Sequence, residues 1–251
     1  RASSHAPAAR NRAIPAPRTH GSPLLSRQTI PQLDPGLQAF SEKVQDFGAD
    51  GSELMRKPFT ESAPKMLLER EHLRVEEHRL RFEEDGRVSA PLDYVVGCPG
   101  DSVAVVLFDG RELIFVRQFR PPAWIGRDEG ETFDGVMTEV VAGKVKSGET
   151  RRAAAIREVR EEVGYVLDDV TPIANFFLAP GSSSERLFLY FAKADPSRKE
   201  PPTQSAQERT EECKFTRTKF YEFIEAGGIC DAKTLAAAEW LRRHGADFGV
   251  T

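Results

Sequence analysis

The chain has few cysteines and no long apolar run. Its 251 residues include three cysteines, Cys98, Cys213 and Cys230, and no two of them form a C-x-x-C pair. This spacing argues against a disulfide framework or a zinc site and is typical of buried or free thiols in a reducing compartment. No apolar run approaches the ~20 residues needed to cross a bilayer, so no membrane span is expected.

Acidic residues are missing from the first 33 positions, which contain five Arg, five Pro and no Lys. Such a segment cannot bury a core, so we expect it to be disordered by itself. It has some of the character of a transit peptide, although its prolines oppose a continuous amphipathic helix, and the chain starts with Arg instead of Met. We therefore expect a mitochondrial matrix location. The alternative is a flexible tail on a cytoplasmic protein.

The whole chain has the composition of a globular protein, with 39% apolar and 29% charged residues. Its length suffices for one large core with appendages. A net charge of −4 gives no support to general nucleic-acid binding. We expect a basic extension and linker at 1–64, with weak helical character around 37–47, and one folded domain at 65–251.

Short β-rich runs separated by turn residues fill residues 65–120. Two Asp-Gly pairs, at 85–86 and 109–110, predict tight turns, the second of them in a hairpin. Further along, the sequence predicts a helix at 153–163, strands at 170–177 and 187–193, and a final helix at 233–243. This mixture predicts an α+β sandwich.

The most informative segment is residues 143–165, GKVKSGETRRAAAIREVREEVGY. Residues 153–163 contain strong helix formers and neither Gly nor Pro, so they should be helical. Glu158 lies three residues before Glu161 and four before Glu162, so the three carboxylates share one helix face. They repel one another unless a cation lies between them, and hard oxygen ligands suit Mg²⁺ or Mn²⁺ far better than a soft metal.

A solvated helix face with ion pairs is the simpler alternative for a segment this rich in Glu and Arg. The flanking residues favour the metal site. Gly143 and Gly148 bracket a short loop, Glu149 leads into the helix, and Gly164 stands where a left-handed cap is expected. A solvated helix needs no such arrangement.

These positions make the chain resemble the Nudix hydrolase family, because every fixed position of that family's signature is present as G-x5-E-x7-R-E-V-x-E-E-x-G-Y. The resemblance implies the Nudix fold, a mixed sheet between helices (α/β/α), and metal-dependent hydrolysis of a nucleoside diphosphate linked to another moiety. It also implies that Glu158 and Glu162 bind the metal, that Glu161 is a further or outer ligand, and that the carbonyl of Ala142 completes the site. Arg157 and Glu149 would orient the helix and its carboxylates.

The resemblance extends over residues 65–243 and indicates the branch that hydrolyses ADP-ribose and nucleotide sugars. Residues 117–121, RQFRP, resemble a strand-end motif of that branch, and residues 139–143, EVVAG, resemble its E-x-P-A-G motif with valine in place of proline. Arg117 or Arg120 would hold the diphosphate, because a guanidinium donates two hydrogen bonds at once. The alternative is that both are surface charges. Glu139 would contact metal or ribose, or only pair with one of these arginines.

Residues 179–185, APGSSSE, resemble a mobile loop of the branch whose Glu is a candidate general base. Glu185 would take a proton from water after the loop closes on substrate, or it is only solvated. Glu161 is the other candidate for a catalytic role. Residues 231–234, DAKT, also recur in this branch.

The leading hypothesis is a nucleoside-diphosphate-sugar diphosphatase that uses Mg²⁺ or Mn²⁺ and releases a nucleoside monophosphate and a sugar phosphate. The candidate substrates are ADP-ribose, ADP-sugars and UDP-sugars. A second hypothesis is an accessory subunit of a large mitochondrial assembly, contacted through the N-terminal extension, with or without activity. Removal of pyrophosphate from RNA 5′ ends is the weakest, because no aromatic-rich basic segment accompanies the basic tail. Relatives in this branch commonly form homodimers through N-terminal strands, which would be residues 65–90 here.

Overall fold

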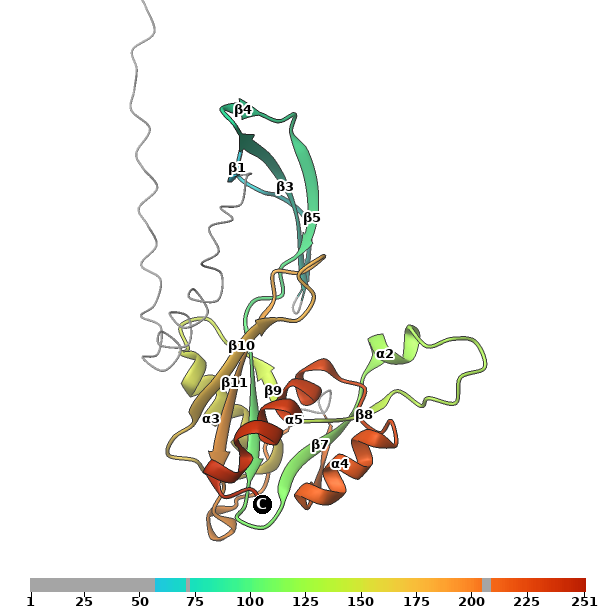
Figure 1. The fold of residues 1–251 in the computed structure, drawn as a ribbon, viewed down its shortest axis with the longest axis vertical. Helices are drawn as coiled ribbons and strands as arrows, with labels where there is room; N and C mark the ends of the chain where they lie inside the picture. Colours follow the sequence, from blue (N-terminus) through green and yellow to red (C-terminus); the bar gives the residue numbers. More distant parts are fainter. Residues whose placement is uncertain (1–56, 71–72, 205–208) are drawn as a thin grey trace, which may run out of the picture. The chain divides into compact units, whose positions relative to one another are not determined.

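The computed structural model describes residues 57–70, 73–204 and 209–251, and these residues form two β-sheets and four α-helices (Figure 1). The basic extension, the weak helix expected around 37–47 and most of the linker lie outside the described residues. Among the helices that the structure describes, none combines the length and the apolar character needed to pass through a bilayer.

The N-terminal sheet is built around one long strand, β3 (Leu73–Glu84). The other four strands all pair with β3 in antiparallel fashion. Asp85 and Gly86 make the turn after β3 with φ of 50° and 71°, so the tight turn predicted from this Asp-Gly pair is confirmed. The strand bounds are β1 (Lys57–Thr60), β2 (Lys65–Arg70), β4 (Arg87–Val88) and β5 (Leu92–Gly97).

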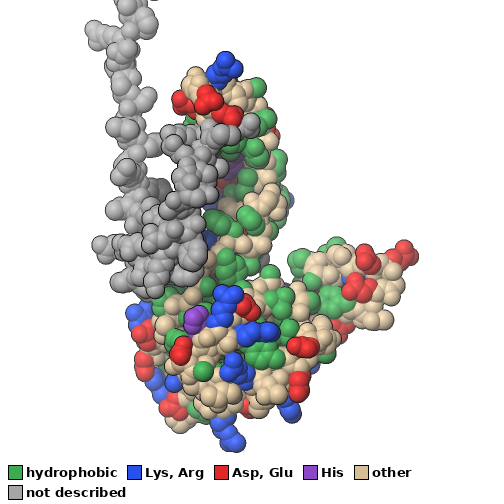
Figure 2. Space-filling view, in the orientation of Figure 1, with side chains coloured by type: hydrophobic (Ala, Val, Ile, Leu, Met, Phe, Trp, Pro, Cys, Tyr) green, Lys and Arg blue, Asp and Glu red, His purple; other side chains and the backbone are tan. Residues whose placement is uncertain are grey.

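The N-terminal sheet has almost no core of its own. Between residues 58 and 97, the described positions include a single buried residue, Glu76. Figure 2 shows apolar side chains along the visible face of this part of the chain. Of the fourteen large apolar side chains that are exposed among the described residues, nine belong to this sheet: Phe59, Met66, Leu67, Leu68, Leu73, Val88, Leu92, Tyr94 and Val95. A sheet this open gains little stability from burial by itself.

The second sheet has seven strands in the order β10-β11-β6-β7-β12, with β8 paired to β7 and β9 paired to β6. The β11–β6 pair is parallel and the other pairs are antiparallel, so the sheet is mixed. The strand bounds are β6 (Ser102–Phe108), β7 (Leu113–Phe119), β8 (Val136–Glu139), β9 (Val141–Lys144), β10 (Thr171–Phe177), β11 (Arg186–Lys193) and β12 (Thr210–Phe215).

Helices cover both faces of this sheet. Alternate side chains of each strand point to opposite faces, so the apolar side chains on each face need a covering layer. Val103, Val105 and Leu107 of β6 pack with the buried residues of α3 (Arg151–Val163). Their neighbours Ala104 and Val106 pack in a second core with α4 (Arg217–Glu225) and α5 (Ala232–His244). The predicted α+β architecture, a mixed sheet between helices, is confirmed.

Most of the elements expected from sequence are present, including the hairpin at Asp109, whose N–H donates to the Glu112 carbonyl. The sequence analysis missed five elements of this domain: the short helix α2 (Pro121–Ile125), the strands β8, β9 and β12, and the helix α4. It also missed β1, which lies in the segment assigned to the linker.

Candidate active site

Helix α3 begins and ends at the residues that its sequence favours. The Thr150 side chain accepts a hydrogen bond from the Ala153 N–H, which caps the first turn. Gly164 ends the helix in the left-handed conformation with φ of 79°. The helix buries four small or branched residues against the sheet: Ala154, Ala155, Val159 and Val163. Glu158, Glu161 and Glu162 are only partly buried and line a cleft beside this packed face.

The cleft has a volume of about 510 Å³ and combines acidic and basic side chains. It is formed by the ends of β6, β7 and β9, by α3, by the start of β11 with the residues before it, and by the start of α5. Its lining residues are Ser102, Gln118, Arg120, Ala142, Gly143, Lys144, Lys146, Arg157, Glu158, Glu161, Glu162, Leu178, Glu185, Leu187 and Lys233.

Arg157 holds the acidic residues of the signature in place. Its guanidinium donates to both carboxylate oxygens of Glu149, at 2.8 and 2.9 Å, and to the Lys144 carbonyl at 2.9 Å. It also donates to Glu158 at 2.7 Å and to Glu161 at 2.8 Å. The same Arg157 hydrogen bonds keep the pKa of Glu149 below its ordinary value. These contacts agree with the positioning role that the resemblance implies for Arg157 and Glu149, and that role stays a prediction.

Gly143 leaves space for the carboxyl group of Glu158. A Cβ atom built at Gly143 would overlap the carboxyl carbon and both oxygens of Glu158. The φ of Gly143 is not in the left-handed region, so space, not backbone conformation, requires glycine here. Burial raises the pKa of Glu158, although the adjacent Arg157 opposes the shift.

Glu162 is the most perturbed carboxyl group of the cleft. Burial, together with the negative charge of Glu158, raises its pKa to about 8. The Ala142 N–H points to Glu162 Oε2 at 3.4 Å. At neutral pH the Glu162 carboxyl is therefore unfavourable as an anion unless positive charge is added beside it.

The residues present fit a divalent cation. The donors are oxygens of two neighbouring carboxylates, Glu158 and Glu162, with Glu161 next to them, and a hard cation removes their mutual repulsion. Ser102 Oγ, which also lines the cleft, is the one buried side-chain N or O atom without a hydrogen-bond partner among the described residues. It leaves a polar contact available to a ligand.

A buried ion-pair cluster forms the wall of the cleft nearest α5. Arg120 Nε donates to Glu139 Oε2 at 2.7 Å, and Lys233 Nζ pairs with the other oxygen of Glu139. Lys233 also pairs with Asp231 at 2.9 Å. Glu139 is only 2% exposed, and these cations are the partners that offset the cost of burying its carboxylate.

The DAKT segment explains how Lys233 reaches this cluster. Asp231 caps α5 by accepting from the Thr234 N–H at 3.0 Å and from the Thr234 hydroxyl at 2.6 Å. The same hydroxyl accepts from the buried Val140 N–H at 3.0 Å, between β8 and β9. Sequence analysis noted this segment but missed Lys233 as a cleft residue, because its place depends on contacts 94 positions away along the chain.

Glu185, the candidate base, lies at the cleft and pairs with Lys144, whose Nζ is 2.7 Å from Glu185 Oε1. The loop before it is attached to the end of β5. Gly97 donates to the Ser182 carbonyl and accepts from the Ser184 N–H, both at 2.9 Å. The structure therefore places Glu185 at the cleft, at the end of a loop held by backbone hydrogen bonds.

The structure brings Arg120 to the cleft but not Arg117. Arg117 is exposed and lies one position out of phase with Val116 and Gln118 of β7, so its side chain points to the face opposite theirs. Arg120 follows the strand and lines the cleft with Gln118. All the other residues expected at the site line the cleft except Glu139, which lies behind Arg120 and Lys233.

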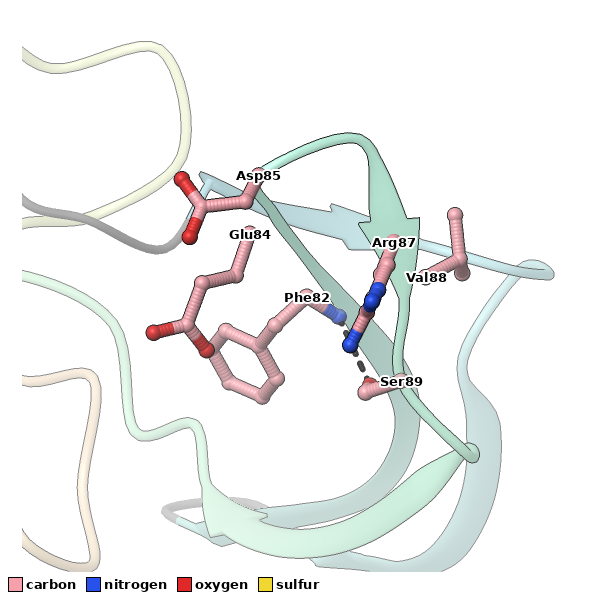
Figure 3. Close-up of a pocket in the computed structure, with 6 residues that line it drawn as sticks. All are labelled: Phe82, Glu84, Asp85, Arg87, Val88 and Ser89. Carbon is pink, nitrogen blue, oxygen red and sulfur yellow. Dashed lines mark hydrogen bonds between the residues drawn. The ribbon is translucent and has the colours of Figure 1, made fainter.

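A second hollow, of about 480 Å³, lies at the β3–β4 turn (Figure 3). Phe82, Glu84, Asp85, Arg87, Val88 and Ser89 line it, and the Phe82 N–H donates to the Ser89 hydroxyl at 3.0 Å. It shares no residue with the cleft and has no cluster of carboxylates comparable to that of α3.

Comparison with known families matches residues 99–242, more than half of the chain, to the NUDIX domain. The chain belongs to the Nudix family. The resemblance drawn from residues 143–165 is thereby confirmed, and with it the prediction of a Nudix hydrolase.

Similar proteins in this family have been named for related substrates. An ADP-ribose pyrophosphatase of Bacillus subtilis (strain 168) is 28% identical over 148 residues, 59% of this chain and 75% of the relative. An ADP-ribose pyrophosphatase of Escherichia coli (strain K12) is 29% identical over 53% of this chain and 62% of the relative. A GDP-mannose pyrophosphatase of Salmonella typhimurium (strain LT2) is 24% identical over 57% of this chain and 74% of the relative.

A solved structure, the crystal structure of an ADP compounds hydrolase, aligns with a TM-score of 0.61 at 18% identity. The alignment covers 80% of this chain and all of that one, which shows that the Nudix fold is shared.

Proposed function

We propose that this Nudix hydrolase is a metal-dependent diphosphatase of nucleoside diphosphate sugars. The observation that carries the proposal is the single cleft in which Glu158, Glu161 and Glu162 stand beside the cations Arg120, Lys144 and Lys233. Carboxylates suit divalent cations, and clustered basic side chains suit a diphosphate. The named relatives support ADP-ribose and sugar nucleotides as the substrate class.

Glu158 and Glu162, with the Ala142 carbonyl, would hold Mg²⁺ or Mn²⁺, and Glu161 would be an outer ligand or assist catalysis. A divalent cation bound there neutralises charge on the phosphoryl oxygens and makes a water molecule more acidic. Arg120 would donate to the diphosphate while Glu139 holds its guanidinium in place. Glu185 would accept the proton from the attacking water, once its carboxylate leaves Lys144.

A substrate panel tests the proposal. The purified chain is incubated with ADP-ribose, ADP-glucose, UDP-glucose and GDP-mannose, with Mg²⁺ or Mn²⁺, and nucleoside monophosphate and sugar phosphate are quantified. We expect hydrolysis of at least one compound and a loss of about 10²–10⁴-fold in kcat/KM for Glu162→Gln. Glu239→Gln, on the exposed part of α5, is the matched control. If all four compounds remain intact with either metal, the proposal is wrong.

We also propose that the protein is a homodimer whose interface is the N-terminal sheet. The support is the set of nine exposed apolar side chains on a sheet without an apolar core of its own. Light scattering after size exclusion measures the mass, and Leu92→Glu combined with Val95→Glu should yield monomers. A wild-type monomer at micromolar concentration would contradict the proposal.

A further inference from the structure

We propose that Glu76, His78 and Cys98 form a separate metal site, of the zinc type, in the N-terminal sheet. The three residues offer a carboxylate oxygen, an imidazole nitrogen and a thiol sulfur, all within 4.8 Å of one another. None of them lines the cleft of α3. A mixed set of this kind suits Zn²⁺ and does not suit Mg²⁺ or Ca²⁺.

Strand pairing brings the three ligands to one face of the sheet. Glu76 and His78 are two positions apart on β3, so their side chains leave the same face. Glu76 is paired with Val96 of β5, and the Cys98 N–H donates to the Arg74 carbonyl at 2.7 Å, which continues that pairing past the end of β5. Cys98 is two positions beyond Val96 and therefore lies on the same face as Glu76.

The distances agree with a tetrahedral zinc site. His78 Nε2 is 3.1 Å from Glu76 Oε2, and Cys98 Sγ is 3.6 Å from the same oxygen. Zinc bonds of about 2.0–2.1 Å to nitrogen and oxygen and about 2.3 Å to sulfur place tetrahedral ligands about 3.3 Å and about 3.6 Å apart. Three protein ligands would leave a fourth position for water.

Glu76 is the one buried residue among the described positions of a sheet whose large apolar side chains are mostly exposed. A carboxylate is a costly choice for such a position unless it has strong partners. Arg74 pairs with the other carboxylate oxygen, Oε1, and leaves Oε2 directed at His78 and Cys98. In a zinc site Arg74 would thus orient the Glu76 carboxylate through the oxygen that does not face the metal, as outer partners of metal ligands do.

The position of the site connects it to the catalytic loop. Cys98 directly follows Gly97, whose backbone is bonded to Ser182 and Ser184 in the loop that ends at Glu185. A metal on Cys98 would fix the chain at this junction. The sequence analysis argued against a zinc site, because the ligands come from β3 and from the residue after β5 and form no C-x-x-C or H-x3-H spacing.

Cobalt titration tests the site, because Co²⁺ bound to thiolate absorbs in the near ultraviolet. The full chain is treated with chelator, kept reduced, and titrated with Co²⁺ in excess Mg²⁺, which keeps the α3 carboxylates occupied. We expect one equivalent of Co²⁺ with a thiolate charge-transfer band that Zn²⁺ abolishes by displacement. His78→Ala should weaken binding at least tenfold, and Glu162→Gln should leave the band unchanged.

The double variant Cys213→Ser/Cys230→Ser assigns the sulfur without altering the site, because Cys98 is then the only thiol of the chain. The band should persist in it and vanish in Cys98→Ser. The proposal is overturned if the wild-type chain gives no thiolate band, which would leave the cluster as hydrogen bonds and ion pairs only, or if the double variant loses the band. Neither result depends on hydrolysis of any nucleotide.

Discussion

Gly143 and the carboxyl group of Glu158 lie so close together that no side chain fits between them. The first residue of the signature is on β9 and the glutamate is on α3, so this contact sets the distance between sheet and helix at the cleft. The glycine therefore has a steric role in the candidate metal site.

Gly143→Ala should move the Glu158 carboxylate and weaken metal binding. We expect kcat/KM to fall by about 100-fold or more and the Mg²⁺ concentration for half-maximal activity to rise, because displaced ligands bind metal less well. Gly97→Ala is the matched control, since a Cβ there makes an ordinary contact of 3.5 Å with the Ser182 carbonyl. Equal metal requirements in the two variants would contradict this account.

The stability of the metal-free protein should fall as pH rises. The pKa of Glu162 is about 8 in the folded chain, above its ordinary value of 4.5, so the protonated carboxyl favours the folded state. This contribution is fully present below about pH 4.5 and is lost as pH rises through 8, with a slope of at most about 1.4 kcal/mol per pH unit. Urea unfolding of the chelator-treated chain between pH 5 and 8 measures the slope.

Glu162→Gln should flatten that dependence, and saturating Mg²⁺ should flatten it in the wild-type chain, because the cation stabilises the charged carboxylate. Glu239→Gln should leave the slope unchanged. If the stability of Glu162→Gln depends on pH as steeply as that of the wild-type chain, titration of Glu162 is not the source of the dependence.

Lys233 and Glu139 should be strongly coupled in stability. Lys233→Met leaves the buried Glu139 with Arg120 alone, and breaking a buried pair costs on the order of 3–5 kcal/mol. Adding Glu139→Gln should recover part of that loss in a double-mutant cycle measured by urea unfolding. The exposed pair Glu239–Arg243 is the control and should show a coupling of about 0.5 kcal/mol or less. Additive effects at Lys233 and Glu139 would show that the pair is not coupled.

Thr234→Val should destabilise the protein more than Thr234→Ser. Valine removes the hydroxyl that accepts from the buried Val140 N–H, which costs about 1–3 kcal/mol when the donor is left unpaired. Serine keeps the hydroxyl and loses only a methyl group. Thermal unfolding compares the two, and a larger loss for serine would mean that packing, not the hydrogen bond, matters at this position.

Arg120→Lys should reduce activity more than Arg117→Lys. Arg120 lines the cleft and is held by Glu139, whereas Arg117 is exposed on the other face of β7. We expect kcat/KM to fall at least tenfold for Arg120→Lys, because lysine cannot donate two parallel hydrogen bonds, and to change less than twofold for Arg117→Lys. Steady-state kinetics with the best substrate of the panel decide between the two arginines.

Local signals explain which elements the sequence predicted. Helix α3 has a capping threonine, a run of helix formers and a terminal glycine within 15 residues, and the two Asp-Gly turns require a positive φ that these residues supply. Strand β12, TEECKF, is polar without a clear period of two and is defined by its pairing with β7. Helix α4 contains several aromatic residues and depends on packing in the second core.

The residues of the candidate site that lie in one segment were predicted from the sequence. Lys233, which comes from a distant segment, was missed. The carboxylates of α3 are close in sequence, so their shared face followed from helical spacing alone. To choose between Arg117 and Arg120, one must know which face of β7 points to α3. The spacing of residues in the sequence does not give that information. Lys233 and Glu139 are 94 positions apart in the sequence. The start of α5 is held beside Glu139 by the hydrogen bond from the Val140 N–H to the Thr234 hydroxyl.

The attachment of residues 182–184 to Gly97 has an energetic consequence for turnover. Any movement of the 182–184 backbone that carries Glu185 toward a bound substrate must either break two backbone hydrogen bonds, each with a net value of about 0.5–1.5 kcal/mol, or carry the end of β5 with it. In the first case the bonds set a threshold that only a well-bound substrate overcomes. In the second, the N-terminal strands take part in every catalytic cycle although they contribute no side chain to the cleft.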